Sequence, residues 1–150
     1  MGTAARPSAA GSHNGVLIVA GGTNFPDALP WDGGKKVWYD DIYVLEKTDG
    51  DSLEWRISDQ ARLPRPLAYG ASVTIPGGVI CIGGNDQEQC YPEVFLLRRD
   101  SDAGQITREH FPPLPVPLAN MAAAIAYNVV YVAGGQEQIS GAAAANHFFA

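Results

Sequence analysis

The stretch Val16-Leu17-Ile18-Val19-Ala20-Gly21-Gly22 decides the fold, because an apolar, largely β-branched run ends abruptly on two adjacent glycines. The pattern returns twice, as Val79-Ile80-Cys81-Ile82-Gly83-Gly84 and as Val129-Val130-Tyr131-Val132-Ala133-Gly134-Gly135. Three such strand endings in one short chain indicate an internal repeat. Glycine at these corners permits unusual backbone dihedrals and removes the Cβ, so that another backbone can approach closely.

The second copy of the repeat shows its plan most clearly. Four strand-like segments with short connections cover residues 68–75, 79–82, 93–98 and 105–110. This arrangement predicts a four-stranded antiparallel meander. The first copy follows the same plan over residues 8–13, 16–20, 41–46 and 53–57, with a long loop at 23–40. The third copy offers strands at 120–127 and 129–133 and stops within a third strand at 146–150.

The repeat predicts an all-β chain of about three four-stranded blades, with units at about 7–58, 68–111 and 119–150 and the last one incomplete. The glycine pairs recur at intervals somewhat longer than the about 40 to 50 residues usual for such blades. A propeller hides its strand edges by closing into a ring. We therefore expect the open ends of this partial propeller to self-associate, or the natural chain to continue beyond Ala150.

Composition excludes several classes of partner. The chain has 150 residues, 46% of them apolar, and 17 glycines and 11 prolines favour short strands joined by turns. A net charge of −6 argues against a nucleic-acid partner. No apolar run is long enough to span a membrane, and the stretch from Met1 to Pro7 lacks the apolar segment of a signal peptide.

No motif points to a metal or a cofactor, and we expect neither. Cys81 lies within a strand pattern, which predicts a small core residue, and Cys90 follows in a loop without metal-ligand spacing. The glycine-lysine run Asp32-Gly33-Gly34-Lys35-Lys36 fails as a phosphate loop. The motif needs glycine at Leu29 and a hydroxyl residue at Lys36.

The order Gly21-Gly22, Tyr43 and Trp55, with the linker Leu63-Pro64-Arg65-Pro66 before the next blade, resembles the kelch repeat. This resemblance implies a kelch-type β-propeller, with Trp55 in the core between blades. Residues 14–22, Gly34-Lys35-Lys36 and the run from Tyr39 to Val44 resemble the N-acetylneuraminate epimerases, or sialic acid mutarotases, in particular their circularly permuted branch.

That family resemblance implies interconversion of sialic acid anomers, a small-molecule sugar as ligand, and a periplasmic or otherwise extracytoplasmic site. Related modules also occur fused to sodium:solute symporters, so a fusion of the full-length protein to a transporter is expected as well. The family's proposed acid/base pair is a glutamate just after a blade's glycines, followed six positions later by arginine. Glu88 and Glu137 occupy such glutamate positions, but Val94 and Ala143 stand where the arginine is expected.

Function should lie on the face that carries the long loops. Glu88 and Glu137 are the catalytic candidates, with the functional alternative that the chain is a non-catalytic kelch scaffold binding a protein or glycan. Arginine and lysine suit a sugar carboxylate, aromatic rings suit sugar faces, and amides suit hydroxyls. The predicted substrate-binding residues are Asn24, Phe25, Trp31, Lys35, Arg65, Asn85 and Gln136. His13, His110 and His147 are expected to be structural.

Overall fold

Eleven strands form three antiparallel sheets in the computed structural model, which describes residues 7–139 and 144–150. The first sheet orders β1 (Ala9–His13), β2 (Val16–Asn24), β3 (Val37–Lys47) and β4 (Leu53–Arg62). The second orders β5 (Ala71–Ile75), β6 (Gly78–Ile82), β7 (Val94–Arg99) and β8 (Ile106–Phe111). The third holds β9 (Ala122–Ala126), β10 (Val129–Ala133) and β11 (Phe148–Phe149), and a single 3-10 turn, η1 (Pro30–Asp32), is the one helical element of the described ranges.

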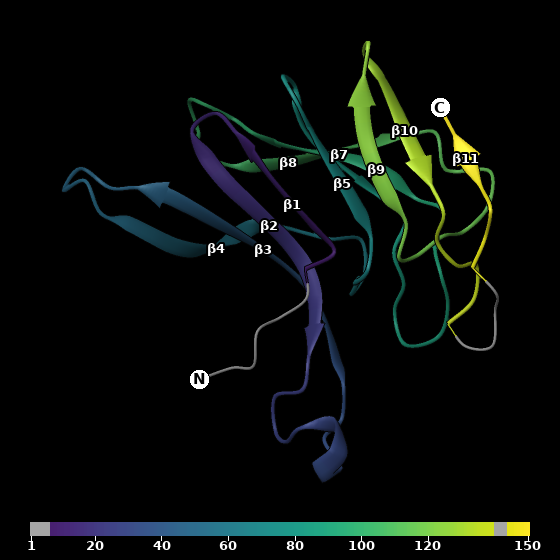
Figure 1. Ribbon diagram of the computed structural model, residues 1–150. Coiled ribbons are helices and arrows are strands. Elements are labelled where there is room, and N and C mark those ends of the chain that lie inside the picture. Colours follow the sequence, from purple (N-terminus) through teal and green to yellow (C-terminus); the bar gives the residue numbers. More distant parts are fainter. Residues whose placement is uncertain (1–6, 140–143) are drawn as a thin grey trace.

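The three sheets fan out like the blades of a propeller. Each begins at an inner strand, and β1, β5 and β9 lie side by side in chain order (Figure 1). The later strands of each sheet lie progressively farther out, with β4 and β8 at the rim. The prediction of an all-β partial propeller is thereby confirmed.

The paired glycines occupy equivalent corners in all three sheets. The first glycine of each pair, Gly21, Gly83 or Gly134, has φ of 61°, 54° or 72°. The second, Gly22, Gly84 or Gly135, has φ of 122°, 109° or 99°. These left-handed and extended positive-φ conformations are ones that residues with a Cβ rarely adopt. The repeat in the sequence is therefore a repeat in backbone geometry.

The first two corners each receive the linker that leads into the next blade. The N–H of Gly84 donates to the carbonyl oxygen of Leu118 at 2.8 Å, and that of Gly22 donates to Leu67 at 2.6 Å. A Cβ on Gly83 would lie 2.4 Å from the Leu118 oxygen, which is closer than such atoms can approach. The linker leucines are fully buried, so the corner joins successive blades through backbone and apolar contacts together.

The inner strands of the first two blades are joined by hydroxyl groups rather than by a shared sheet. Ser72 on β5 donates to the carbonyl of Ala10 at 2.8 Å and accepts from its N–H at 3.1 Å. Thr74 accepts from the N–H of Ser12 at 3.3 Å. These bonds satisfy part of the free edge of β1, which would otherwise leave strand groups unpaired near the axis.

Two apolar cores fill the spaces between blades. Between the first and second, Ile18, Ile42 and Val44 contact a set that includes Cys81, Phe95 and Leu97. Between the second and third, Ile80, Ile82 and Leu96 pack with Leu118 and Val132. Cys81 is 3% exposed, as expected of a core residue, and burial raises the pKa of its thiol far above the ordinary range.

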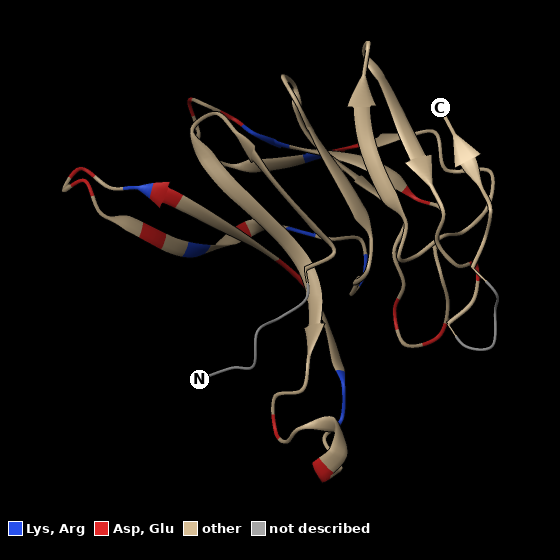
Figure 2. Cartoon of the chain, viewed as in Figure 1, with Lys and Arg blue, Asp and Glu red and all other residues tan. Residues whose placement is uncertain are grey.

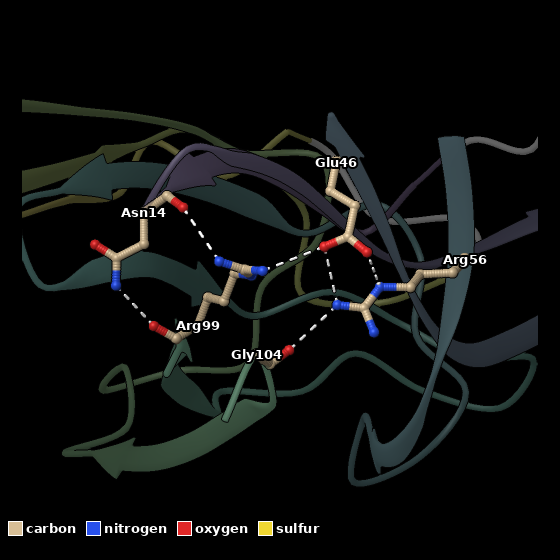
Figure 3. Close-up of polar contacts among 5 residues, drawn as sticks. All are labelled: Asn14, Glu46, Arg56, Arg99 and Gly104. Carbon is tan, nitrogen blue, oxygen red and sulfur yellow. Dashed lines mark hydrogen bonds and ion pairs between the residues drawn. The ribbon is translucent and has the colours of Figure 1, made fainter. Parts of the chain in front are cut away.

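Glu46 holds the outer parts of the first two blades together on the side of the short turns (Figure 3). Its carboxylate accepts from Arg56 Nε at 2.6 Å and from Arg99 Nη2 at 3.2 Å. Arg56 also reaches the carbonyl of Gly104, and Asn14 Nδ2 donates to the carbonyl of Arg99 at 2.8 Å. One carboxylate between two guanidinium groups thus links strands from both sheets.

Two sequence predictions need correction. Trp55 is 54% exposed and does not lie between blades. Its register partner on β3 is Leu45, and both point to the face of the first sheet that turns away from the second. The long loop is also shorter than predicted, because β2 and β3 continue past Gly22 as a two-stranded ribbon and leave only residues 25–36 between strands.

The corner contacts predict unequal costs for two equivalent substitutions. Gly134 has the same left-handed φ as Gly83, but nothing in the described structure lies within 4 Å of a Cβ built on it. Both Gly83→Ala and Gly134→Ala should lower the free energy of unfolding by about 1 kcal/mol, because alanine is strained in the left-handed region. Gly83→Ala should lower the free energy of unfolding by about a further 1 to 3 kcal/mol, because its Cβ clashes with the Leu118 carbonyl.

Urea unfolding at a concentration where the chain is monomeric measures both losses. Equal destabilisation by the two substitutions would show that the corner does not clamp the next blade.

Candidate functional site

The long connections gather at one end of the fan. The ribbon of β2 and β3, the 83–93 loop and the segment after Gly134 all emerge at the lower end of Figure 1. The tight turns at 14–15, 76–77 and 127–128 emerge at the opposite end. Antiparallel alternation enforces this division, so the linkers that enter β5 and β9 also belong to the long-loop end.

Lys36 lies among three aromatic rings at this end. Its Nζ is 4.9 Å from the ring centroid of Tyr69, 5.3 Å from that of Trp38 and 5.8 Å from that of Phe25. It also donates to the Tyr69 hydroxyl at 2.7 Å. These distances fall within the range of cation–π attraction. We call Lys36 with Phe25, Trp38 and Tyr69 the lysine cage.

Tyr69 and Asn120 each lie two residues before an inner strand, β5 or β9, in a left-handed conformation with φ of 59° and 57°. The two positions are linked, because the N–H of Asn120 donates to the Tyr69 carbonyl at 2.8 Å. Asparagine tolerates this region, whereas a bulky aromatic residue there is uncommon. Their repetition shows that the blade architecture itself imposes the conformation near the axis.

Arg65 forms a second cluster on the linker before β5. Its guanidinium lies 4.1 Å from the ring centroid of Tyr91, and its Nη2 is 2.7 Å from Glu93 Oε1. The positive charge is therefore already balanced by a carboxylate of the second blade. This arrangement fixes the linker onto the 83–93 loop.

Asp86 organises that loop. Its Oδ1 accepts from the N–H groups of Glu88 and Gln89 at 2.7 and 3.0 Å, and its Oδ2 accepts from the Tyr91 hydroxyl at 2.6 Å. Burial opposes ionisation, but the Tyr91 hydroxyl and the two backbone donors outweigh it and hold the pKa of Asp86 below its usual value.

Glu137, two residues after Gly135, contacts His147, which immediately precedes β11. His147 Nε2 lies 2.7 Å from Glu137 Oε1, and the imidazole stacks on Phe149 at 5.5 Å. Ala143, where the family pattern expects an arginine, lies outside the described residues. A paired carboxylate and imidazole can exchange a proton with a bound ligand.

The other predicted residues are placed as follows. Asn24 accepts from the Tyr39 hydroxyl at 2.8 Å, which leaves its amide N–H groups for other partners. Asn85 is 5% exposed and its backbone pairs with Ala68, so its side chain faces the interior. Gln136 is half-buried and pairs with Ala119 in the same way, whereas Trp31, Lys35 and Glu88 are exposed.

The structure thus brings Phe25 into the lysine cage, Arg65 into an ion pair with Glu93, and Glu137 into hydrogen-bond contact with His147. It does not bring all the candidates into one cluster. The sequence alone did not reveal the roles of Tyr69, Asn120 and Asp86 or the pairing of His147. The repeated Leu-Ala at 67–68 and at 118–119 marks the equivalence of Tyr69 and Asn120 and could have revealed both.

Other parts of the described structure offer less for a sugar. A groove of about 640 Å³ between the second and third sheets is lined by apolar side chains, including Ile80, Phe111, Val132 and Phe149. It lacks the convergent polar groups that sugar hydroxyls require. Within residues 7–139 and 144–150, no cluster of three or more His, Cys, Asp or Glu suits a metal ion. No helix in these ranges is long and apolar enough to cross a membrane.

Comparison with known proteins agrees with this geometry. The N-acetylneuraminate epimerase of Brucella suis is 38% identical over 104 residues, which cover 63% of this chain and 25% of the relative. That of Yersinia pestis is 36% identical over 93 residues, covering 53% and 22%. This chain is similar to N-acetylneuraminate epimerases. The aligned part spans about a quarter of the length of these curated relatives, and no family model matches the sequence.

The solved structure of YjhT shows the same fold. It aligns with a TM-score of 0.60 at 16% identity, over 91% of this chain and 36% of YjhT. Because YjhT is a kelch-type β-propeller, the chain adopts part of that architecture, as the sequence predicted.

The hydrogen bond from Tyr91 to Asp86 predicts a pH-dependent loss of stability in Tyr91→Phe. The lowered pKa of Asp86 means that its ionised form stabilises the fold above the unfolded pKa, and that this contribution disappears as pH falls through the folded pKa. Tyr91→Phe should therefore lower the free energy of unfolding by about 1 kcal/mol near neutral pH, and by progressively less as the pH falls.

Tyr39→Phe is the matched control, because its hydroxyl donates to the neutral amide oxygen of Asn24. Urea unfolding across pH should show a constant loss in Tyr39→Phe. A constant loss in Tyr91→Phe would contradict the role given to Asp86.

Proposed function

We propose that this chain is part of a kelch-type mutarotase that interconverts anomers of N-acetylneuraminate or a related sugar. The observation that supports the proposal most strongly is the similarity to N-acetylneuraminate epimerases, at 38% identity over 104 residues. The long-loop end supports it further, since it combines a caged lysine, the half-buried amides of Asn24 and Gln136, and a carboxylate–imidazole pair.

Mutarotation requires opening of the sugar ring. A base removes the proton of the anomeric hydroxyl, the bond from the anomeric carbon to the ring oxygen breaks, and an acid protonates that ring oxygen. The open-chain carbonyl then closes from its other face with the proton transfers reversed. In our proposal Glu137 and His147 exchange these protons, and Asn24 and Gln136 bind hydroxyls.

Location and fusion belong to the same proposal. We expect the reaction to take place outside the cytoplasm, in the periplasm where the cell has one, and the full-length protein to be fused to a transporter. Fractionation of cells that express the tagged full-length protein tests both expectations, because a fused transporter would hold the protein in the membrane fraction.

A second candidate function is a non-catalytic kelch scaffold that binds a glycan or a protein through the long-loop end. The sequence observation that favours it is the absence of arginine six positions after Glu88 and Glu137, where Val94 and Ala143 stand instead. A scaffold would bind sugar without changing the rate of anomer exchange.

Proton NMR of one freshly dissolved anomer of N-acetylneuraminate separates these functions. We expect the chain to accelerate the approach to anomeric equilibrium, and Glu137→Gln to slow that acceleration about 100-fold, as loss of a general acid or base does. The matched control is Glu88→Gln, which changes an exposed carboxylate with no side-chain partner among the described residues. Sugar binding without acceleration would favour the scaffold, and the absence of both would contradict the proposal.

A further inference from the structure

The cationic groups of the long-loop end differ in how their charges are balanced. Arg65 is paired with Glu93, and Arg62 is paired with Asp40 and Asp41 at 2.9 and 2.7 Å. Lys36 is half-buried, and in the described structure no carboxylate lies within ion-pair distance of its Nζ. A partly desolvated ammonium without a counter-ion is unfavourable unless an anion completes the site.

Tyr69 gives the cage a second donor. Its backbone is held in the left-handed region at a cost of about 1 kcal/mol, where Asn120 at the equivalent place fits better. The phenol supplies a reason for tyrosine here, because its oxygen accepts from Lys36 Nζ at 2.7 Å. Its own O–H remains to donate, so the pair still offers both N–H and O–H donors to a ligand.

We propose that the lysine cage is the site that binds the carboxylate of a sugar acid, with Lys36 as the charged anchor and Tyr69 as the second donor. The inference rests on the proposed function for the identity of the sugar. Among the cations at this end, Lys35 is exposed and Arg65 is already paired, which leaves Lys36 as the anchor.

Titration of Lys36→Met and Lys35→Met with N-acetylneuraminate and with its methyl ester tests the anchor. Methionine keeps an apolar stem among the rings while it removes the charge. The wild-type chain should prefer the acid over the ester by about tenfold or more, as expected for a hydrogen bond to a charged group. The preference should disappear in Lys36→Met and persist in Lys35→Met. If Lys36→Met keeps the preference for the acid, or if both variants lose it equally, the assignment of Lys36 as the anchor is wrong.

The indole N–H signal of Trp38, assigned with Trp38→Phe, reports on the cage independently of sugar chemistry. Sodium acetate should shift this signal in the wild-type chain relative to sodium chloride at equal ionic strength, and should not shift it in Lys36→Met. If acetate does so while no sugar binds, the anion site stands and the proposed function fails. If neither acetate nor the sugar acid shifts the signal, the anion site itself is wrong.

A separate observation concerns the outer faces of the first and third sheets, which no blade of the described structure covers. Register matching places Leu17 and Tyr43 of the first sheet at the positions of Val79 and Phe95 in the second. Val79 and Phe95 are 1% and 2% exposed because they pack on the preceding blade, whereas Leu17 is 36% exposed. The free face of the first sheet comprises Leu17, Val19, Tyr43, Leu45, Leu53, Trp55 and Ile57, and we call it the leading face.

The third sheet presents the opposite kind of face. Tyr131 and Phe148 hold the positions of Ile80 and Val94, which in the second sheet pack on the following blade. Their rings lie 5.7 Å apart, and Phe148 is 66% exposed. The strands of this sheet carry no Lys, Arg, Asp or Glu (Figure 2). We call this free face the trailing face; it comprises Ala122, Ala124, Val129, Tyr131, Ala133 and Phe148.

We propose that the trailing face of one copy receives the leading face of a second copy, head to tail, as successive blades pack within the chain. The contact continues an interface that the molecule already contains twice. Two copies joined at both ends would place about six blades around one axis, within the usual range of about four to eight.

Mixing two variants distinguishes this arrangement from any other. Light scattering should give the wild-type chain at least twice its mass of 15.9 kDa, and Trp55→Lys and Phe148→Lys, each alone, should be folded monomers by circular dichroism and mass. An equimolar mixture should form dimers, because it retains one intact leading face and one intact trailing face. Tyr127→Lys, at a turn residue that is 98% exposed, is the control and should associate like the wild type.

A monomeric wild-type chain would overturn the proposal. So would a mixture that stays monomeric, or a single variant that still dimerises, since that would indicate pairing between identical faces.

Discussion

The structure depends on the contact between a double-glycine corner and the linker of the following blade. At Gly83-Gly84 the carbonyl of Leu118 occupies the space of a missing Cβ and accepts the second glycine's N–H. The same geometry at Gly21-Gly22 receives Leu67. Because each linker leads directly into an inner strand, the corner sets the position of the next blade relative to the one before it.

The corner also explains where function can lie. Beyond each glycine pair the chain must leave a buried strand, and it does so at the same end of every blade. The linker that fills the corner ends at Ala68 or Ala119, and the next residue, Tyr69 or Asn120, turns left-handed toward the axis. The long loops and these strained residues therefore meet at one end, which is the arrangement that a ligand site on a rigid scaffold requires.

The fold was largely predictable, because its repeat consists of residues with strong local backbone preferences. Glycine pairs, alternating apolar runs and turn residues act locally, so the strands and their order could be predicted from the chain alone. Trp55 was misplaced because its burial depends on a neighbouring blade that the first sheet lacks among the described residues. The extension of β2 and β3 into a ribbon was missed because strand pairing beyond a glycine corner depends on partners such as Trp38 and Thr23.

The candidate site was less predictable, because it depends on which charges find partners in three dimensions. Residue type alone made Arg65 a better carboxylate ligand than lysine. Its pairing with Glu93, which is far away in the sequence, removes that advantage, and the burial of Lys36 among three rings cannot be read from two adjacent lysines. The positions of the loops were predictable, but the electrostatic state of each side chain was not.

Amide hydrogen exchange at the corner glycines tests the central claim most directly. If the linker carbonyls bind them as described, the N–H groups of Gly22 and Gly84 should exchange as slowly as those of the central strand β6, and far more slowly than that of Gly50 in an exposed turn. Exchange of Gly22 and Gly84 at the rate of Gly50 would show that the corners do not hold the blades together.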